Sequence, residues 1–218
     1  MSLDRDKLME IITQTGTLQN GHFMLSSGRH SDEYWEKFRL LEWPRVTERL
    51  CREIAARYEG ATIGAVVGPT TGGALLAQEV ARQLGTRCLL AEPVLEKGGR
   101  ELRRGFTLRQ RERVLIVDDV LTTGLSLRET LSAVERFQPA IVGIEVLIDR
   151  SGGTAAGQFG VACHALLTVS ARTYEPGECP LCASGVPVVK PGTRGIPAEK
   201  VKAYEVSGEV IDGLAPAE

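Results

Sequence analysis

The sequence has few of the features that mark a membrane, secreted or nucleic-acid-binding protein. No apolar run approaches the roughly twenty residues that a membrane helix needs. The first residues, Met-Ser-Leu-Asp-Arg-Asp-Lys, lack the apolar core of a signal peptide. The formal net charge is −2 over 218 residues, so basic residues are not in excess, as a nucleic-acid surface would require. We therefore expect a cytoplasmic protein with neither a membrane nor a nucleic acid as its partner.

Cysteine is scarce and odd in number, which fits reduced thiols better than a disulfide framework; the residues are Cys51, Cys88, Cys163, Cys179 and Cys182. Cys179 and Cys182 have CxxC spacing, which brings two thiolates to one metal. A structural zinc site needs four ligands, however, and the sequence has no second CxxC and no HxxxH. Cys163 and His164 could in principle complete such a site. We favour a tight structural turn at 179–182 over a metal site.

Histidine is scarcer still, with three residues in the chain. His22 and His30 flank the polar stretch near residue 25, and neither has a recognisable nucleophile or metal partner in the sequence. We therefore assign no catalytic role to either.

The hydrophobic pattern predicts alternating strands and helices between residues 45 and 170. Predicted helices cover 4–15, 45–58, 72–84 and 126–137, and predicted strands cover 63–67, 88–91, 114–117, 141–148 and 161–169. Such alternation favours a mostly parallel sheet with right-handed crossovers. We expect three parts, an N-terminal segment 1–44, an α/β core 45–170 and a loop-rich extension 171–218. Residues 96–105 and 174–197 are expected to form loops, and 198–218 are weakly patterned.

The most informative segment is 114–126, Val-Leu-Ile-Val-Asp-Asp-Val-Leu-Thr-Thr-Gly-Leu-Ser. A buried strand runs into Asp118 and Asp119, and a small turn then opens a helix, which in an open α/β sheet is where ligands bind. Backbone N–H groups in the turn suit a phosphate. Hydroxyl groups join them at Thr122, Thr123 and Ser126. Since like charges repel, the two acids suit the hydroxyls of a ribose instead. The segment therefore predicts a sugar-phosphate site.

This arrangement resembles the phosphoribosyl-pyrophosphate (PRPP) motif of type I phosphoribosyltransferases. The resemblance implies their α/β fold, a central mostly parallel sheet flanked by helices, with a small N-/C-terminal hood over the site. It implies that Asp118 and Asp119 act as catalytic residues that hold the ribose, while the turn holds the 5-phosphate. The implied PRPP-binding residues are Asp118, Asp119, Val120, Leu121, Thr122, Thr123, Gly124, Leu125 and Ser126. The alternative is a solvated strand-to-helix loop in another doubly wound domain.

A second glycine-rich loop, Gly68-Pro-Thr-Thr-Gly-Gly-Ala74, closes one predicted strand and opens a helix. Glycines let the backbone approach an anion closely, and the helix dipole adds attraction. In the family the equivalent loop binds pyrophosphate, which implies this role for Thr71, Gly72 and Gly73. An ordinary tight turn is the alternative.

The stretch 25–35, Leu-Ser-Ser-Gly-Arg-His-Ser-Asp-Glu-Tyr-Trp, resembles the signature of the orotate phosphoribosyltransferases, a Ser-Gly-Arg-x-Ser element followed by two aromatics. The resemblance implies that Tyr34 and Trp35 border the pyrimidine, although core packing is the commoner role of such a pair. The orotate-binding residues that it implies are Ser27, Gly28, Arg29, Tyr34, Trp35, Thr122 and Arg150. One departure is Ser26, where many members of the family have a lysine that contacts pyrophosphate.

Asp149-Arg150 ends the predicted strand 141–148, where orotate enzymes present an arginine to the substrate. The planar guanidinium matches a carboxylate with two parallel hydrogen bonds, and orotate has a carboxylate that adenine, guanine and uracil lack. An ordinary surface ion pair is the alternative reading of Arg150.

The basic segment 96–105, Glu-Lys-Gly-Gly-Arg-Glu-Leu-Arg-Arg-Gly, resembles the loop that in this family closes over the partner subunit's active site. It lacks the commonest pattern of the family and is closer to a Leu-Arg-Arg-Gly variant. Its basic residues are Lys97, Arg100, Arg103 and Arg104, of which Lys97 and Arg100 are the leading candidates for catalytic contact with pyrophosphate. A solvated charge run is the alternative. The same resemblance implies a homodimer.

The implied reaction is that of an orotate phosphoribosyltransferase, a pentosyltransferase. Orotate and PRPP give orotidine 5-monophosphate and pyrophosphate, a step in pyrimidine (UMP) biosynthesis. Mg2+ is the implied cofactor, held mainly by PRPP and water. A purine-type phosphoribosyltransferase would share the PRPP motif and differ in its base pocket. A PRPP-sensing regulator on the same fold would need a basic face or an added DNA-binding domain.

Overall fold

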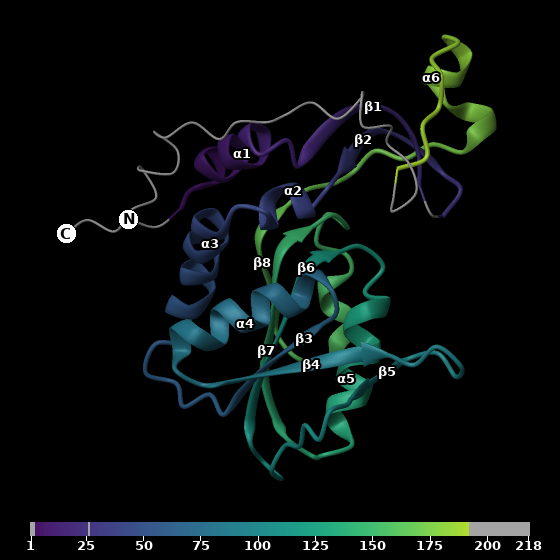
Figure 1. The fold of residues 1–218 in the computed structure, drawn as a ribbon. Helices are drawn as coiled ribbons and strands as arrows, with labels where there is room; N and C mark the ends of the chain where they lie inside the picture. Colours follow the sequence, from purple (N-terminus) through teal and green to yellow (C-terminus); the bar gives the residue numbers. More distant parts are fainter. Residues whose placement is uncertain (1–2, 26, 192–218) are drawn as a thin grey trace. The chain divides into compact units, whose positions relative to one another are not determined.

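The computed structural model describes residues 3–25 and 27–191, and it divides the chain into two compact units. The first unit consists of residues 1–3 and 43–169, and the second of residues 4–42 and 170–218 (Figure 1). Residues 4–42 and the described residues 170–191, which were predicted to form separate segments, thus belong to one unit. Ser26, the predicted departure from the family, and the weakly patterned segment 198–218 lie outside the described residues.

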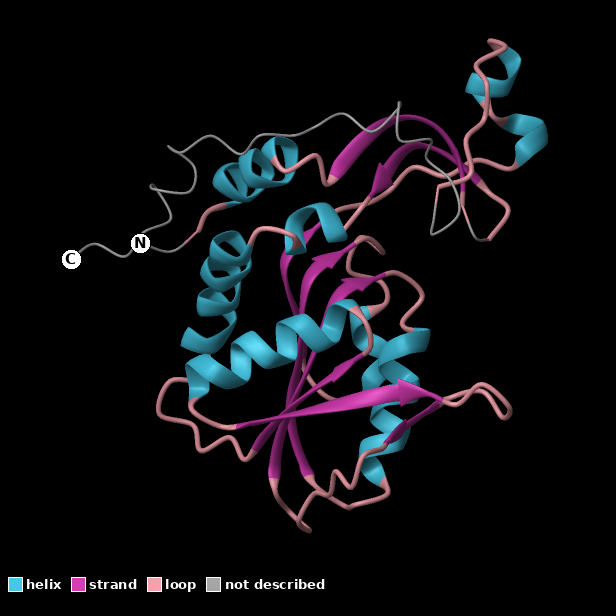
Figure 2. Cartoon of the chain, in the orientation of Figure 1, coloured by secondary structure: helices cyan, strands magenta, loops and turns pink. Residues whose placement is uncertain are grey.

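A six-stranded sheet with the order β5-β4-β3-β6-β7-β8 forms the centre of the first unit (Figure 2). The neighbours β3–β4, β3–β6, β6–β7 and β7–β8 are parallel, and only the edge pair β4–β5 is antiparallel. The strands are β3 (Ala65–Pro69), β4 (Arg87–Pro93), β5 (Arg100–Leu102), β6 (Arg113–Leu121), β7 (Ala140–Asp149) and β8 (Cys163–Thr168). The sheet confirms the predicted mostly parallel α/β fold.

Helices α3 (Pro44–Ala56), α4 (Gly72–Leu84) and α5 (Leu125–Glu135) flank this sheet, and a 3-10 turn, η1 (Ala156–Phe159), precedes β8. One core joins Leu127 and Leu131 of α5 to alternate strand residues such as Val67 and Ile116. Because successive strand residues point to opposite faces, residues between these, such as Val66, face the other side of the sheet. Of the described helices, none is both long and apolar enough to cross a bilayer.

The second unit contains α1 (Arg5–Gln14), α2 (Phe38–Leu41) and a hairpin of β1 (Leu18–Met24) and β2 (His30–Trp35). The chain returns to this unit after residue 169 and forms the short turns η2 (Pro176–Glu178) and α6 (Pro180–Ala183). The returning segment pairs with the hairpin at two bridges, Phe23 with Val189 and His30 with Tyr174. Both strands of the hairpin therefore have a backbone partner in the segment that follows residue 169.

The structure corrects the element prediction at several places, among them the expected loop 174–197, where the short turns η2 and α6 form. Strand β6 extends to Leu121, so Asp118 and Asp119 lie inside the strand, where β7 supplies backbone partners as far as Asp149. Within the expected loop 96–105, residues 100–102 form β5, because they pair with the edge of β4. The hairpin β1–β2 was not predicted, because its polar composition hides the alternation of a half-buried strand.

Candidate functional site

The acid pair lies near the carboxyl end of β6, and both side chains are almost completely buried. Asp118 is 5% exposed and Asp119 is 3% exposed. The backbone N–H of Asp119 donates to Oδ1 of Asp118 at 2.9 Å, and the N–H of Val120 donates to Oδ1 of Asp119 at 2.6 Å. These bonds fix the orientation of two neighbouring carboxylates, both of which are buried from solvent.

The glycine-rich loop that opens α4 packs directly against these carboxylates. A Cβ atom at Gly72 would overlap Oδ2 of Asp119, and a Cβ at Gly73 would lie 2.8 Å from Oδ1 of Asp118. A Cβ at Gly68 would overlap the carbonyl oxygen of Gly73. All three glycine positions of this loop, Gly68, Gly72 and Gly73, therefore accept only glycine without rearrangement. The structure brings this loop and the acid pair together, as their positions at neighbouring strand ends predict.

Two helix N-termini open next to the acid pair. Thr71, the N-cap of α4, makes no side-chain capping hydrogen bond within the described residues, and Gly124, the N-cap of α5, has no side chain that could make one. The first N–H groups of a helix have no intrahelical acceptor and carry a partial positive charge, so these turns suit anions. Gly124 has a φ of 78°, in the left-handed region. The predicted phosphate residues of the turn are Thr122, Thr123, Gly124, Leu125 and Ser126.

The carbonyl oxygen of Thr123 takes no part in the proposed binding of an anion. It accepts hydrogen bonds from Nη1 of Arg128 at 2.9 Å and from the amide of Gln158 at 3.3 Å. The side chains of Thr122 and Thr123 are exposed, so their hydroxyls are accessible to a ligand.

Arg150 directly follows β7 and is joined to the motif strand. Its backbone N–H donates to the carbonyl of Leu121 at 2.9 Å, and Leu121 is paired with Asp149 across β6 and β7. The carboxylate of Asp149, 2% exposed, accepts from the N–H of Ser151 at 2.7 Å and from its hydroxyl at 2.6 Å. Asp149 thus fixes the turn that carries the half-buried Arg150.

The basic segment forms the hairpin β4–β5 with its turn at 94–99, instead of the expected loop. Nη1 of Arg100 donates to the carbonyls of Ala91 at 2.9 Å and Thr70 at 3.3 Å, and its Nε lies 3.5 Å from Oε2 of Glu129. Arg100 therefore contacts the backbone of the glycine-rich loop. Lys97 is exposed near the hairpin tip. A cavity of about 360 Å³ between the hairpin and α5 is lined by four basic side chains, Lys97, Arg100, Arg128 and Arg136, and by two acidic ones, Glu101 and Glu129.

Two other arginines of the hairpin form ion pairs within it. Nε of Arg104 lies 2.7 Å from Oε1 of Glu92, and Arg103 lies 3.9 Å from Glu101. The hydrogen bonds from Arg104 hold the pKa of the Glu92 carboxyl below its usual value. Arg104 therefore forms its ion pair with a residue of the same hairpin, whereas Lys97 is exposed.

The N-terminal signature residues belong to the second unit. Nε of Arg29 donates to the hydroxyl of Thr173 at 2.9 Å, and its Nη1 pairs with Glu175. The hydroxyl of Ser31 donates to the carbonyl of Arg172 at 2.8 Å. These residues hold the hairpin to the segment after residue 169.

The two signature aromatics differ in exposure. Trp35 is only 5% exposed, whereas Tyr34 is half-buried and its ring lies 5.6 Å from that of Phe23. The burial of Trp35 agrees with the core-packing alternative, while Tyr34 presents part of its ring to solvent. The role of both at a pyrimidine stays a prediction.

The partners predicted for the CxxC pair, Cys163 and His164, were wrong. His22 and His30 lie beside Cys179 and Cys182, and the four potential ligand atoms are within 4.8 Å of one another. His164, proposed as a completing ligand, instead lies 3.1 Å from Glu145 in the first unit. More than 150 residues of sequence separate His22 from the cysteines, so spacing gave no signal of this cluster.

Comparison with known proteins agrees with this geometry. The phosphoribosyl transferase domain family matches residues 39–162. An orotate phosphoribosyltransferase of Desulforamulus reducens is 46% identical over 89% of this chain and 100% of its own length. That of Pelotomaculum thermopropionicum is 47% identical with the same coverage. The crystal structure of orotate phosphoribosyltransferase from Aeropyrum pernix has a TM-score of 0.63 and 27% identity, over 74% of this chain and 93% of that one. This chain belongs to the orotate phosphoribosyltransferases, within the type I phosphoribosyltransferase family.

Proposed function

We propose that this protein transfers the phosphoribosyl group of PRPP to orotate, giving orotidine 5-monophosphate and pyrophosphate in pyrimidine (UMP) biosynthesis. The observation that carries the proposal is the packing of the buried pair Asp118–Asp119 against the glycine start of α4, beside the uncapped turn that opens α5. This arrangement offers carboxylates for a polyol and N–H groups for phosphates at one edge of the sheet. The orotate relatives support orotate over a purine as the base.

The ribose and its 5-phosphate would use two neighbouring parts of the motif. The carboxylates of Asp118 and Asp119 would accept hydrogen bonds from the two ribose hydroxyls, which keeps C1 of the sugar in place. The N–H groups from Thr122 to Ser126, with the three hydroxyls, would hold the 5-phosphate at the N-terminus of α5. Because the C1–oxygen bond breaks with oxocarbenium character at the sugar, no protein nucleophile is needed, and fixed charges and orientation supply the catalysis.

The leaving pyrophosphate would lie on the loop Thr71, Gly72 and Gly73, where the dipole of α4 favours its negative charge. Arg100 contacts the carbonyl of Thr70 in this loop, which supports a role for its charge beside the pyrophosphate. Lys97 at the hairpin tip would add charge when the hairpin closes, which excludes water from the reacting sugar.

The donor set of the site fits Mg2+, which prefers oxygen ligands and keeps several waters. PRPP and water would mainly hold Mg2+, and the hard carboxylate oxygens of Asp118 and Asp119 suit a cation next to the ribose. When bound, Mg2+ neutralises charge on the pyrophosphate as a Lewis acid.

The base would be read mainly by Arg150. Its guanidinium forms a planar fork that matches the orotate carboxylate, and its backbone is hydrogen bonded to the end of the PRPP motif. Thr122 would contact the base from the motif itself. A role at the pyrimidine for the N-terminal signature residues Ser27, Gly28, Arg29, Tyr34 and Trp35 rests on the family resemblance alone.

We infer a cytoplasmic homodimer, as the family resemblance implies. The segment 96–105 would take the intersubunit role, and its Lys97 is exposed near the hairpin tip, where it is open to contact with a second copy. In that arrangement the hairpin of one subunit would close over the partner's site.

The direct test mixes the purified chain with PRPP, Mg2+ and orotate and follows both orotate and pyrophosphate. We expect orotate loss and pyrophosphate release in equal amounts. Release of pyrophosphate without any orotate consumed would contradict the proposal, because it would indicate hydrolysis of PRPP instead of transfer.

A further inference from the structure

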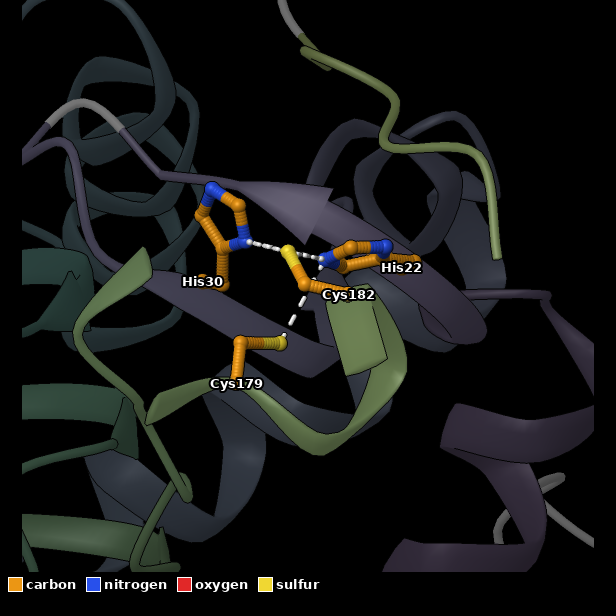
Figure 3. Close-up of side chains that lie close together, drawn as sticks. All are labelled: His22, His30, Cys179 and Cys182. Atoms are coloured by element: carbon orange, nitrogen blue, oxygen red, sulfur yellow. Dashed lines mark hydrogen bonds between the residues drawn. The ribbon is translucent and has the colours of Figure 1, made fainter. Parts of the chain in front are cut away.

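Four side chains of zinc-binding type converge in the second unit, and none of the four is among the residues assigned to substrate (Figure 3). His22 comes from β1 and His30 from β2, while Cys179 precedes α6 and Cys182 lies within it. One helical turn separates the two cysteines, so both thiols are on the side of α6 that faces the hairpin. The exposed fractions of His22, His30 and Cys179 are 3%, 6% and 2%, whereas Cys182 is exposed and forms the solvent side of the cluster.

Four of the six separations between these atoms are close to those of a tetrahedral zinc site. Nε2 of His22 lies 3.5 Å from Sγ of Cys179 and 3.7 Å from Sγ of Cys182. Nδ1 of His30 lies 3.3 Å from Sγ of Cys182 and 2.9 Å from Nε2 of His22. Zinc bonds of about 2.0–2.1 Å to nitrogen and about 2.3 Å to sulfur require ligand separations of about 3.3–3.8 Å in a tetrahedron. To admit the ion, the two nitrogens would have to separate slightly, and the widest separation in the cluster, which is up to 4.8 Å, would have to shorten.

The ring of His22 is oriented by a partner outside the cluster. Its Nδ1 lies 2.7 Å from the carbonyl oxygen of Val186. A carbonyl can only accept, so Nδ1 carries the proton and the lone pair of Nε2 points into the cluster. A hydrogen bond from the second ring nitrogen to a backbone carbonyl is the usual outer-shell partner of a metal-binding histidine.

Backbone pairing fixes both histidines against the segment that carries the cysteines. The carbonyl of His22 accepts from the N–H of Val189 at 2.8 Å. His30 and Tyr174 exchange both of their N–H···O bonds, each at 2.8 Å. The ligands are therefore held by main-chain contacts on both sides of η2 and α6, and the cluster does not depend on mobile side chains alone.

The second unit needs such a crosslink more than the first. Its buried apolar residues among those described are Leu8, Ile11, Ile12, Phe23, Trp35, Leu40, Leu41 and Cys179. Only Cys179 of these comes from the described segment 170–191. Since this segment contributes so little to an apolar core, a bound metal would supply the stability that burial does not.

We propose that His22, His30, Cys179 and Cys182 bind one structural zinc ion, which ties the β1–β2 hairpin to the segment 170–191. Two thiolates and two imidazoles complete a tetrahedral Cys2His2 site, which leaves no open position for catalysis. The absence of a carboxylate from this set of ligands argues against Mg2+ or Ca2+. On binding, the two thiols release their protons to solvent, and the site of Zn2+ and two thiolates is neutral.

The first experiment measures zinc in the full chain by inductively coupled plasma mass spectrometry. The protein is expressed without a histidine tag and purified without a chelator. We expect about one zinc per chain in the wild type, with large losses in Cys179→Ser, Cys182→Ser and His22→Gln. The matched controls Cys163→Ser and His164→Gln, which lie in the first unit, should keep the metal.

Cobalt distinguishes a thiolate site from adventitious zinc. Exchange of zinc for Co2+ in the wild type should give intense visible absorption of a tetrahedral ion and a near-ultraviolet thiolate-to-cobalt band. The thiolate band should weaken in Cys182→Ser. A wild type without zinc that takes up cobalt with no thiolate band would overturn the proposal. So would a Cys179–Cys182 disulfide in the protein isolated under reducing conditions.

Hydrogen exchange of the wild type locates the effect without relying on variants that fail to fold. Removal of zinc by a strong chelator should raise exchange of residues 18–35 and 170–191 and leave β3 and β6 protected. Unchanged exchange in the second unit would contradict a structural role. This inference is independent of the proposed reaction, because metal content and exchange are read without substrate.

Discussion

The carboxylate of Asp119 lies against the backbone of Gly72, in the space that a side chain at position 72 would fill. The neighbouring pair repeats the relationship, since a Cβ at Gly73 would lie 2.8 Å from Oδ1 of Asp118. The ribose-binding and pyrophosphate-binding parts of the proposed site thus share one packed contact between β6 and the start of α4. Changes on one side of this contact should therefore be felt on the other.

The substitution Gly72→Ala tests this contact. The added methyl group must displace the Asp119 carboxylate, and overpacking of this kind costs about 1–3 kcal/mol of unfolding free energy. We expect turnover to fall at least about tenfold, since a misplaced catalytic group is costly. Thermal unfolding and steady-state rates give the two readouts. Gly157→Ala is the control, because nothing lies within 4 Å of its Cβ position. Equal behaviour of the two variants would refute the steric coupling.

The substitution Asp119→Asn keeps the shape of the side chain and removes its charge. If the carboxylate holds a ribose hydroxyl in the transition state, kcat should fall by about 100-fold or more while the circular dichroism spectrum is unchanged. Glu135→Gln, an exposed change at the end of α5, serves as the control for loss of one negative charge. Near-normal turnover of Asp119→Asn would remove this residue from the ribose site.

Arg150→Ala should separate the two substrates. Loss of hydrogen bonds to a charged group is worth about 1.5–3 kcal/mol, so the KM for orotate should rise about 10- to 100-fold. The KM for PRPP should change little. Arg150→Lys should recover only part of the loss, because an ammonium cannot form the bidentate fork. Arg82→Ala, an exposed arginine of α4, is the control. A parallel rise of both KM values would contradict the role of Arg150 as the carboxylate reader.

Cys163 should react slowly with alkylating reagents at neutral pH. Burial, with smaller contributions from the negative charges of Asp149 and Glu145, raises the pKa of its thiol from 9.0 to about 11. Below both values the thiolate, and hence the alkylation rate, should be about 100-fold lower than for an ordinary cysteine. The rate, followed by peptide mass mapping, should keep rising to about pH 11. A plateau near pH 9 would show that the site does not suppress ionisation.

The α/β core was largely predictable because its elements are long and strongly periodic. Helix α4 occupies the predicted residues 72–84, and β3, β4, β6, β7 and β8 all occur near their predicted positions. Local motifs within this core, such as the acid pair and Gly72–Gly73, were also predictable, since their chemistry is written in adjacent residues. The ends of the strands were less predictable, because pairing with β7 continues strand β6 past Asp118 and Asp119.

The second unit was harder to predict because its structure depends on contacts between distant segments. Strand β2 has the sequence His-Ser-Asp-Glu-Tyr-Trp, in which apolar and polar residues do not alternate. The residue with which it pairs, Tyr174, lies far away in the sequence. The same distance concealed the approach of His22 and His30 to the CxxC pair. The signal that the sequence did contain was a lone CxxC pair in a chain that also has histidines without an assigned role, at whatever distance in sequence.

The most direct test of the proposed function compares bases in one steady-state assay with PRPP and Mg2+. Orotate, adenine, hypoxanthine, xanthine and uracil are supplied in turn, and pyrophosphate release is followed for each. We predict turnover with orotate, equimolar formation of its ribonucleotide, and no comparable rate with the other four bases. Preferential turnover of a purine would contradict the base assignment, and PRPP binding without turnover of any base would contradict the enzymatic function itself.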